Sequence, residues 1–142
     1  FDNIMDANHC ERIKTIGDGY LAVCGMPSKD EKHALNLVRA AVEMIEFLED
    51  RNQTAEFSWQ MRIGIHSGEV VGGVVGIKKY SYDVFGDTIN CAARLEQHSA
   101  PMKINLSATT WALVDSIYSS IPRGNVETKG KGPIQMHYLV RR

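Results

Sequence analysis

An aspartate between two glycines, Gly17-Asp18-Gly19, is the first segment of the chain whose residue types could do chemistry. A carboxylate held at a sharp turn could bind the Mg²⁺ that accompanies a triphosphate, because Mg²⁺ prefers oxygen ligands and is usually held by one or two carboxylates. Aspartate is also common in turns for a purely structural reason, since its side chain bonds to its own backbone. The tripeptide alone leaves both readings open.

Asn90 and Arg94 lie four residues apart in a segment with helical periodicity, so their side chains share one face of the expected helix. An amide beside a guanidinium offers several donors and a fixed positive charge, which suits an oxyanionic phosphorus centre. The small residues between them would let another surface come near. The alternative is an exposed helix face on which Arg94 pairs with Asp87 or Glu96, and the two readings are equally supported.

Two further segments are weaker signals. Lys129-Gly130-Lys131-Gly132 supplies two ammonium groups on a backbone that can approach phosphate closely, yet such loops are also common solvated surface. His66 precedes a serine, but neighbouring residues of a strand face opposite ways and no nucleophile elbow is present. We therefore expect His66 to be structural.

The elements that must position these residues follow from periodicity and turn residues. Residues 12–16 and 20–24 alternate as strands and predict a hairpin with its turn at Asp18. A capping box at Ser28 and Glu31 precedes a helix that runs to about Asp50, followed by an exit loop over residues 51–54. Further strands are expected over residues 59–66, 70–76, 80–85, 103–106, 124–127 and 135–140, and further helices over residues 1–5, 87–98 and 107–114.

Composition predicts one soluble globular domain. The chain has 142 residues, 44% hydrophobic and 23% charged, with a formal net charge of −1. This charge predicts no general affinity for nucleic acid, and no apolar run is long enough to cross a bilayer, so we expect no membrane contact by this segment. Cys10, Cys24 and Cys91 are widely spaced, which favours reduced thiols and a cytoplasmic location over zinc or a disulfide framework.

Four separated segments together resemble the class III adenylyl/guanylyl cyclase catalytic domain, in order and spacing along the whole chain. The resemblance implies an α+β fold with a ferredoxin-like βαββαβ core and additional C-terminal strands, in agreement with the element order above. The matching segments are residues 13–20 (IKTIGDGY), 62–70 (RIGIHSGEV), 82–94 (YDVFGDTINCAAR) and 129–132 (KGKG).

By this resemblance, Lys14 and Asp83 match the pair of residues that reads the purine. Adenylyl cyclases have Lys and Asp or Thr at these positions, whereas guanylyl cyclases have Glu and Cys. A lysine donor suits adenine N1, and an aspartate acceptor suits the 6-amino group. Guanine would mispair both groups, at a cost of about 1–3 kcal/mol each in a desolvated pocket. The resemblance therefore implies ATP as the substrate.

The remaining family roles also match residues of this chain. Asp18 matches the second of two metal-binding aspartates, Asn90 and Arg94 match the residues that position the ribose and stabilise the transition state, and Lys129 matches the lysine that holds the terminal phosphates. The implied reaction is conversion of ATP to 3′,5′-cyclic AMP and pyrophosphate with two Mg²⁺ or Mn²⁺ ions. The alternatives are a non-catalytic cyclase-like domain that regulates or dimerises and, against Lys14 and Asp83, a guanylate cyclase.

One departure concerns the first metal aspartate, which in the family lies upstream of the helix with which this chain begins. Asp2 superficially imitates it but is too close to Lys14 to match. We expect residues 1–142 to be a single catalytic domain without its N-terminal strand and first helix, and alone to have little or no activity. The family acts as dimers with shared sites, and this chain carries residues of both kinds, so a homodimer is expected for the intact domain.

Overall fold

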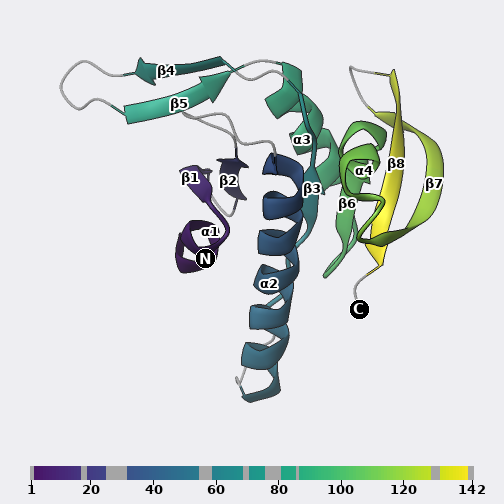
Figure 1. The fold of residues 1–142 in the computed structure, drawn as a ribbon, viewed down its shortest axis with the longest axis horizontal. Coiled ribbons are helices and arrows are strands. Elements are labelled where there is room, and N and C mark those ends of the chain that lie inside the picture. Colours follow the sequence, from purple (N-terminus) through teal and green to yellow (C-terminus); the bar gives the residue numbers. More distant parts are fainter. Residues whose placement is uncertain are drawn as a thin grey trace.

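The computed structural model describes residues 2–16, 19–24, 32–54, 59–68, 71–75, 81–85, 87–128 and 132–140. Helices and strands are mixed along this chain, which confirms the expected α+β class (Figure 1). The elements are α1 (Asp2–Ala7), β1 (Cys10–Ile16), β2 (Gly19–Cys24), α2 (His33–Thr54), β3 (Ile63–Ile65), β4 (Val71–Val75), β5 (Ser81–Phe85), α3 (Asp87–Gln97), β6 (Ile104–Ser107), α4 (Ala108–Val114), β7 (Ser119–Thr128) and β8 (Gly132–Val140).

The described strands form three hydrogen-bonded sheets. The pairs β1–β2 and β4–β5 are antiparallel two-stranded hairpins. A four-stranded sheet has the order β3-β6-β8-β7, with β3 parallel to β6 and the other neighbours antiparallel. The parallel pair requires a crossover between β3 and β6, and the β4–β5 hairpin and α3 make up this connection.

The end of α2 differs from the expected exit loop, because residues 51–54 are its last turn. The Asn52 amide donates to the Trp59 carbonyl at 2.7 Å and accepts from the Trp59 N–H at 2.8 Å. The Arg51 guanidinium lies 4.6 Å from the Trp59 ring centroid. These contacts hold Trp59 outside the ladder, so the strand expected over residues 59–66 is only Ile63–Ile65. The capping box at residues 28–31 lies outside the described residues.

The core is organised around α2, which presents apolar residues on two faces. One face, including Val38, Ala41 and Ile45, packs in a cluster with side chains of the four-stranded sheet and α4. The other face, including Ala40 and Met44, packs against α1 and the β1–β2 hairpin. Figure 1 shows α2 standing between the hairpin and the sheet. The hairpin is therefore attached to the rest of the domain mainly through one helix.

The opposite face of the sheet is covered by α3. Alternation along β3 directs Ile63 and Ile65 into the α2 cluster and leaves Gly64 against α3. A Cβ atom at Gly64 would lie 2.6 Å from the Leu95 carbonyl carbon and 2.7 Å from the Ala92 carbonyl oxygen. Leu95 itself is fully buried against Met136. The glycine thus permits a helix-to-strand approach that no side chain would allow.

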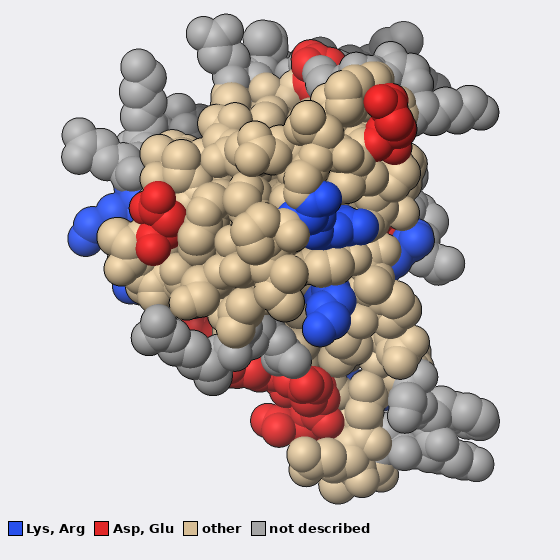
Figure 2. All heavy atoms as spheres, turned by 90° about the vertical axis from the view of Figure 1, so that its right-hand side faces the viewer, with Lys and Arg blue, Asp and Glu red and all other residues tan. Residues whose placement is uncertain are grey.

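The long hairpin of β7 and β8 closes the far edge of the sheet. A bulge at Arg123 shifts its register, and the guanidinium lies over the Tyr138 ring at 4.2 Å while donating to the His98 carbonyl at 2.8 Å. On the face of the molecule seen in Figure 2, lysines and arginines occur in small groups separated by uncharged residues and acids. No helix within the described ranges has the length and apolar character required to span a bilayer.

The approach of β3 to α3 predicts a large effect of Gly64→Ala on stability. The added methyl group meets backbone atoms that cannot move aside, so we expect a loss of about 3 kcal/mol in the free energy of unfolding. Gly124→Ala is the control, because Gly124 has φ +69° and open space around it, and only the backbone strain of about 1 kcal/mol applies. Urea unfolding followed by circular dichroism measures both, and equal losses would contradict the packing argument.

Candidate functional site

The β1–β2 hairpin carries two of the predicted site residues. Ile16 pairs with Gly19, so the strands converge immediately beside Asp18, which itself lies outside the described residues. Lys14 pairs with Leu21, and its side chain is also outside the described part. The register shifts between Arg12 and Lys14, and Ile13 is the extra residue on β1. A bulge breaks the regular alternation of faces and is a common means of redirecting a side chain near a binding site.

Asp83 is on the second hairpin, in β5, directly opposite Gly73 of β4. Glycine leaves no side chain across the ladder from Asp83, although the Asp83 side chain is among those not described. Strands β1 and β5 contact each other, and Figure 1 shows the β4–β5 hairpin extending over the β1–β2 hairpin. The strands that carry Lys14 and Asp83 are therefore neighbours, although these residues are far apart in sequence.

Asn90 and Arg94 lie on α3 as predicted, four residues apart. Asn90 is exposed and Arg94 is half-buried, and the Arg94 Nη1 donates to the Asn90 carbonyl at 3.1 Å. The ion pair of Glu96 is with Arg62, at 3.3 Å. Of the small residues between Asn90 and Arg94, Cys91 packs into the core. It cannot form part of an open face, which corrects that part of the sequence interpretation.

Lys129 and Lys131 lie outside the described residues. They follow β7 directly, and the last pair of the β7–β8 ladder, Thr128 with Gly132, brackets them. The Thr128 hydroxyl donates to the Gly132 carbonyl at 2.8 Å. The loop is therefore attached to a defined end of the sheet.

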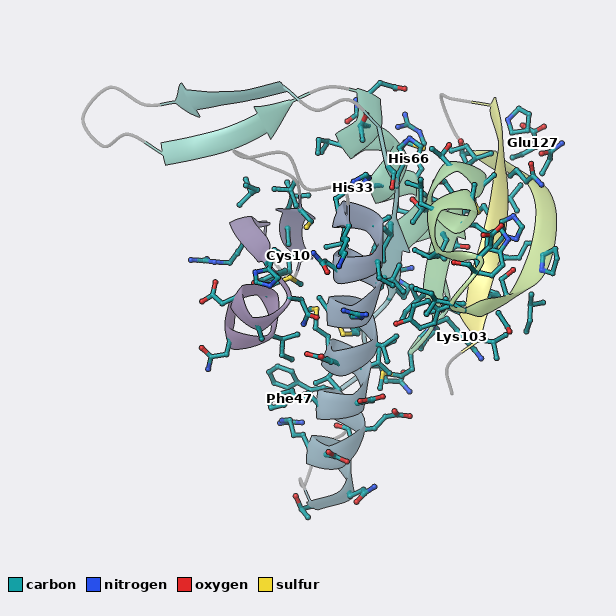
Figure 3. The ribbon with its side chains drawn as sticks, viewed as in Figure 1. Cys10, His33, Phe47, His66, Lys103 and Glu127 are labelled. Atoms are coloured by element: carbon teal, nitrogen blue, oxygen red, sulfur yellow. The ribbon has the colours of Figure 1, made fainter. Side chains whose placement is uncertain are left out.

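His66 belongs to a hydrogen-bonded network, which fits the expectation of a structural role (Figure 3). Its Nδ1 lies 2.8 Å from the Ser107 hydroxyl, which lies 3.2 Å from the Thr110 hydroxyl. The Thr110 hydroxyl also lies 3.0 Å from that of Ser67 and donates to the Ile65 carbonyl at 3.4 Å. Ser107 caps α4, accepting from the Thr110 N–H.

This network connects the end of β3 to the beginning of α4, and the residue that follows it lies close to α3. Thr110 is fully buried and links Ser67 to the α4 cap. The next residue, Gly68, lies so close to Thr88 that a Cβ atom there would be 2.8 Å from the Thr88 hydroxyl. Thr88 precedes Asn90 by two residues in the first turn of α3. Sequence reasoning missed Thr110, since a threonine in a short helix carries no signal of a partner 43 residues away.

The metal expectation rests on Asp18. Within the ranges that the structure describes, no group of three or more His, Cys, Asp or Glu side chains could hold a metal ion. A carboxylate at residue 18 has the hard oxygen donors that Mg²⁺ or Mn²⁺ requires, and its assignment as a metal ligand stays a prediction because Asp18 lies outside the described residues.

Comparisons with known proteins identify the family to which the chain is similar. A family model described as the adenylate and guanylate cyclase catalytic domain matches residues 1–141. The soluble guanylate cyclase subunit beta-2 of Rattus norvegicus is 38% identical over 143 residues, which cover 99% of this chain and 21% of that protein. The chain thus spans about a fifth of the length of that relative.

Two solved structures are similar over 99% of this chain. The guanylate cyclase domain of RhGC from Catenaria anguillulae in complex with GTP has a TM-score of 0.91 and 32% identity, with 78% of that chain covered. The catalytic core of a rhodopsin-guanylyl cyclase with converted specificity, in complex with ATPαS, has a TM-score of 0.89 and 34% identity, with 77% covered.

The network predicts that the Thr110 hydroxyl contributes more to the free energy of unfolding than the Thr110 methyl group does. Thr110→Val keeps the shape but leaves the buried Ser67 hydroxyl without its partner, so we expect a loss of about 2 kcal/mol in the free energy of unfolding. Thr110→Ser is the matched control, which keeps the hydroxyl and removes one methyl group at about 1 kcal/mol. Urea titration compares the two, and a larger loss for Thr110→Ser would refute the role of the network.

Proposed function

The chain belongs to the adenylate and guanylate cyclase catalytic domain family, and we propose that it converts ATP to 3′,5′-cyclic AMP and pyrophosphate. The observation that carries the choice of ATP is the presence of Lys14 and Asp83 on two strands that contact each other. A lysine and an aspartate offer a donor and an acceptor, which complement adenine N1 and the 6-amino group. Guanine has the opposite pattern, with an N–H donor at N1 and a carbonyl acceptor at position 6, so both side chains would be mispaired.

The overall similarity to guanylate cyclases does not argue strongly against this assignment. Identity of 38% reports on the whole domain, most of which builds the core rather than the purine pocket. The GTP complex and the ATPαS complex of the converted enzyme have nearly the same similarity to this chain, with TM-scores of 0.91 and 0.89. One backbone therefore suits both nucleotides, and individual side chains must select the purine.

The proposed reaction forms a bond between the ribose 3′-oxygen and the α-phosphorus and breaks the bond to the pyrophosphate leaving group. In this scheme the exposed Asn90 amide orients the ribose, and the Arg94 guanidinium neutralises charge that develops at phosphorus. The contact of the Arg94 Nη1 with the Asn90 carbonyl holds the guanidinium beside Asn90. Lys129 would bind the terminal phosphates as a point charge.

Asp18 would hold Mg²⁺ or Mn²⁺, and a divalent ion bound there supplies a Lewis acid that offsets phosphate charge. In the same proposal two copies of the domain share each site. In each site, Asp18 would come from one copy, and Asn90 and Arg94 would come from the other copy. A homodimer has two such sites, and we assign the second metal carboxylate to no residue of this chain. Tests of activity use the natural polypeptide that contains this chain.

Purine selection is tested by Lys14→Glu and Asp83→Cys, singly and together. Each single change mispairs adenine, so kcat/KM for ATP should fall about tenfold or more, since one unsatisfied group costs about 1–3 kcal/mol. The double variant should prefer GTP. Lys103→Glu, a change at an exposed lysine that follows α3, is the charge-matched control and should keep the ATP preference.

A natural polypeptide that prefers GTP would overturn the assignment, and one that turns over neither nucleotide would favour a regulatory domain.

Shared sites predict that two inactive variants complement each other. Asp18→Ala and Arg94→Ala should each lower kcat by about 10²-fold or more, because each removes a charge that acts in the transition state. A mixture forms heterodimers with one intact site and should recover up to about a quarter of the wild-type rate, since half of randomly assorted dimers are mixed. Asp6→Ala and Arg62→Ala are the controls and should remain active. Failure of the mixture to recover would place all residues of a site in one copy.

A further inference from the structure

Cys10 and Cys24 face each other across the open end of the β1–β2 hairpin. They are the first pair of this antiparallel ladder, with Cys10 beginning β1 and Cys24 ending β2. Residues directly opposite in antiparallel strands project from the same face of the sheet. The two thiols, 14 positions apart in sequence, are therefore on one side of the hairpin.

The side-chain contacts agree with this register. Both cysteines pack in the apolar cluster of Met44 and Ala40, on the side of the hairpin that faces α2. The Cys10 thiol donates to the Asn8 carbonyl at 3.5 Å, and the Cys24 thiol donates to the carbonyl of the next residue, His9, at 3.3 Å. The two thiols therefore contact the backbone of the same turn, at adjacent residues. Figure 3 shows Cys10 at this point, where α1 meets β1.

This geometry is close to that of a disulfide. Opposed residues of antiparallel strands have Cα atoms about 4.5–5.5 Å apart, and a disulfide accepts Cα separations of about 4.4–6.8 Å. Their Cβ atoms are about 4.5–5.5 Å apart, whereas a disulfide needs about 3.5–4.5 Å. A closure of about 1 Å is therefore sufficient. The third cysteine, Cys91, packs in a different cluster with Leu95 and Met136, and has no such opposed residue.

We propose that Cys10 and Cys24 form a redox-modification site that peroxide converts to a disulfide and that thiols reduce again. Cys24 is the more exposed sulfur, while Cys10 is only 6% exposed. The Cys24 thiolate attacks hydrogen peroxide, giving a sulfenic acid and hydroxide. The Cys10 thiolate then displaces the hydroxyl group from the Cys24 sulfur, and a disulfide forms. Overall, two thiols and one hydrogen peroxide yield one disulfide and two waters.

Reversibility follows from the position of the pair. A disulfide that must pull two opposed strands together is strained, and strained disulfides are the more easily reduced ones. Such a bond suits a thiol that is normally kept reduced and is oxidised transiently.

The location also connects the site to function, and this step rests on the proposed function. The cross-link closes the open end of the hairpin whose other end leads to Asp18 and whose first strand carries Lys14. The cross-link draws together the first pair of the β1–β2 ladder. The bulge at Ile13 lies only three residues after Cys10 in the same strand. Oxidation is therefore expected to alter how the hairpin presents these two residues.

Peptide mapping tests the site without any need for activity. Trypsin cuts after Arg12, Lys14, Lys29, Lys79 and Arg94, so the three cysteines fall in three separate peptides: one that ends at Arg12, one of residues 15–29 and one of residues 80–94. After treatment of the natural polypeptide with one equivalent of hydrogen peroxide, non-reducing mass spectrometry should show the peptide that ends at Arg12 joined to peptide 15–29, 2 Da lighter than their sum because two hydrogens are lost. Dithiothreitol should separate them.

Three variants sharpen the test. The cross-link should persist in Cys91→Ser and disappear in Cys10→Ser and Cys24→Ser. In Cys10→Ser the sulfenic acid at Cys24 has no resolving thiol, so labelling by dimedone should exceed that of Cys10 in Cys24→Ser at least fivefold. Absence of the cross-link between Cys10 and Cys24, or equal cross-linking through Cys91, overturns the site. Dominant labelling at Cys10 overturns the order of attack.

The functional step has its own readout. In wild type and Cys91→Ser, oxidation should change the cyclase rate at least twofold and dithiothreitol should reverse the change, whereas Cys10→Ser should not respond. A formed cross-link with an unchanged rate overturns the link to the hairpin. No cyclase activity in the reduced protein contradicts the proposed function, while the peptide map still decides the redox site.

Discussion

Burial of two opposite faces of α2 is the interaction on which the rest of the structure depends. Val38, Ala41 and Ile45 pack towards the four-stranded sheet, and Ala40 and Met44 pack towards α1 and the β1–β2 hairpin. A two-stranded hairpin has too little apolar surface to be stable alone. The helix therefore supplies the buried surface that makes the hairpin a defined platform for Lys14 and Asp18.

The second constraint is the close contact of α3 with the other face of the sheet. Gly64 lets the helix backbone approach β3, and the Asn105 amide donates to the Leu95 carbonyl at 2.9 Å from within the core. The Asn105 Oδ1 has no hydrogen-bond partner among the residues that the structure describes, which adds a polar cost to this junction. Together with the close approach of Gly68 to Thr88, these contacts hold the helix that carries Asn90 and Arg94 against the sheet. Rigid support of this kind is what a positioning site requires.

In the candidate site, the fold provides the framework, and individual side chains provide the contacts that would select the base. The sheet, α2 and α3 create the framework, and structures with GTP or ATPαS share it with this chain. Lys14 and Asp83 lie on hairpins that project from this framework, where a side chain can change without disturbing the core. Base selection can therefore differ between proteins with similar overall sequences, because mispaired hydrogen bonds in a pocket cost more than most surface changes. Because the β1–β2 hairpin lies outside the core around Ile45, the proposed redox pair can lie at the open end of this hairpin without altering that core.

Much of the local structure was predictable because its signals are local. Helical spacing around Asn90 predicted α3, periodicity over residues 107–114 predicted α4, and the alternation around Gly17 to Gly19 predicted the first hairpin. The ordered segments also predicted the family, which the match over residues 1–141 confirms. The sequence alone thus determined the types and the order of the elements.

Register, element ends and long-range partners were decided only by the tertiary structure. Asn52 and Trp59 extended α2 and shortened β3, because side-chain to backbone bonds replaced ladder bonds there. The bulge at Ile13, the partners of Thr110 and the pairing of Cys10 with Cys24 depend on contacts between residues that are distant in sequence or on the exact alignment of two strands. Propensity and periodicity are properties of neighbouring residues, whereas register is set by the sum of contacts across a packed core, and that sum exists only in the folded chain.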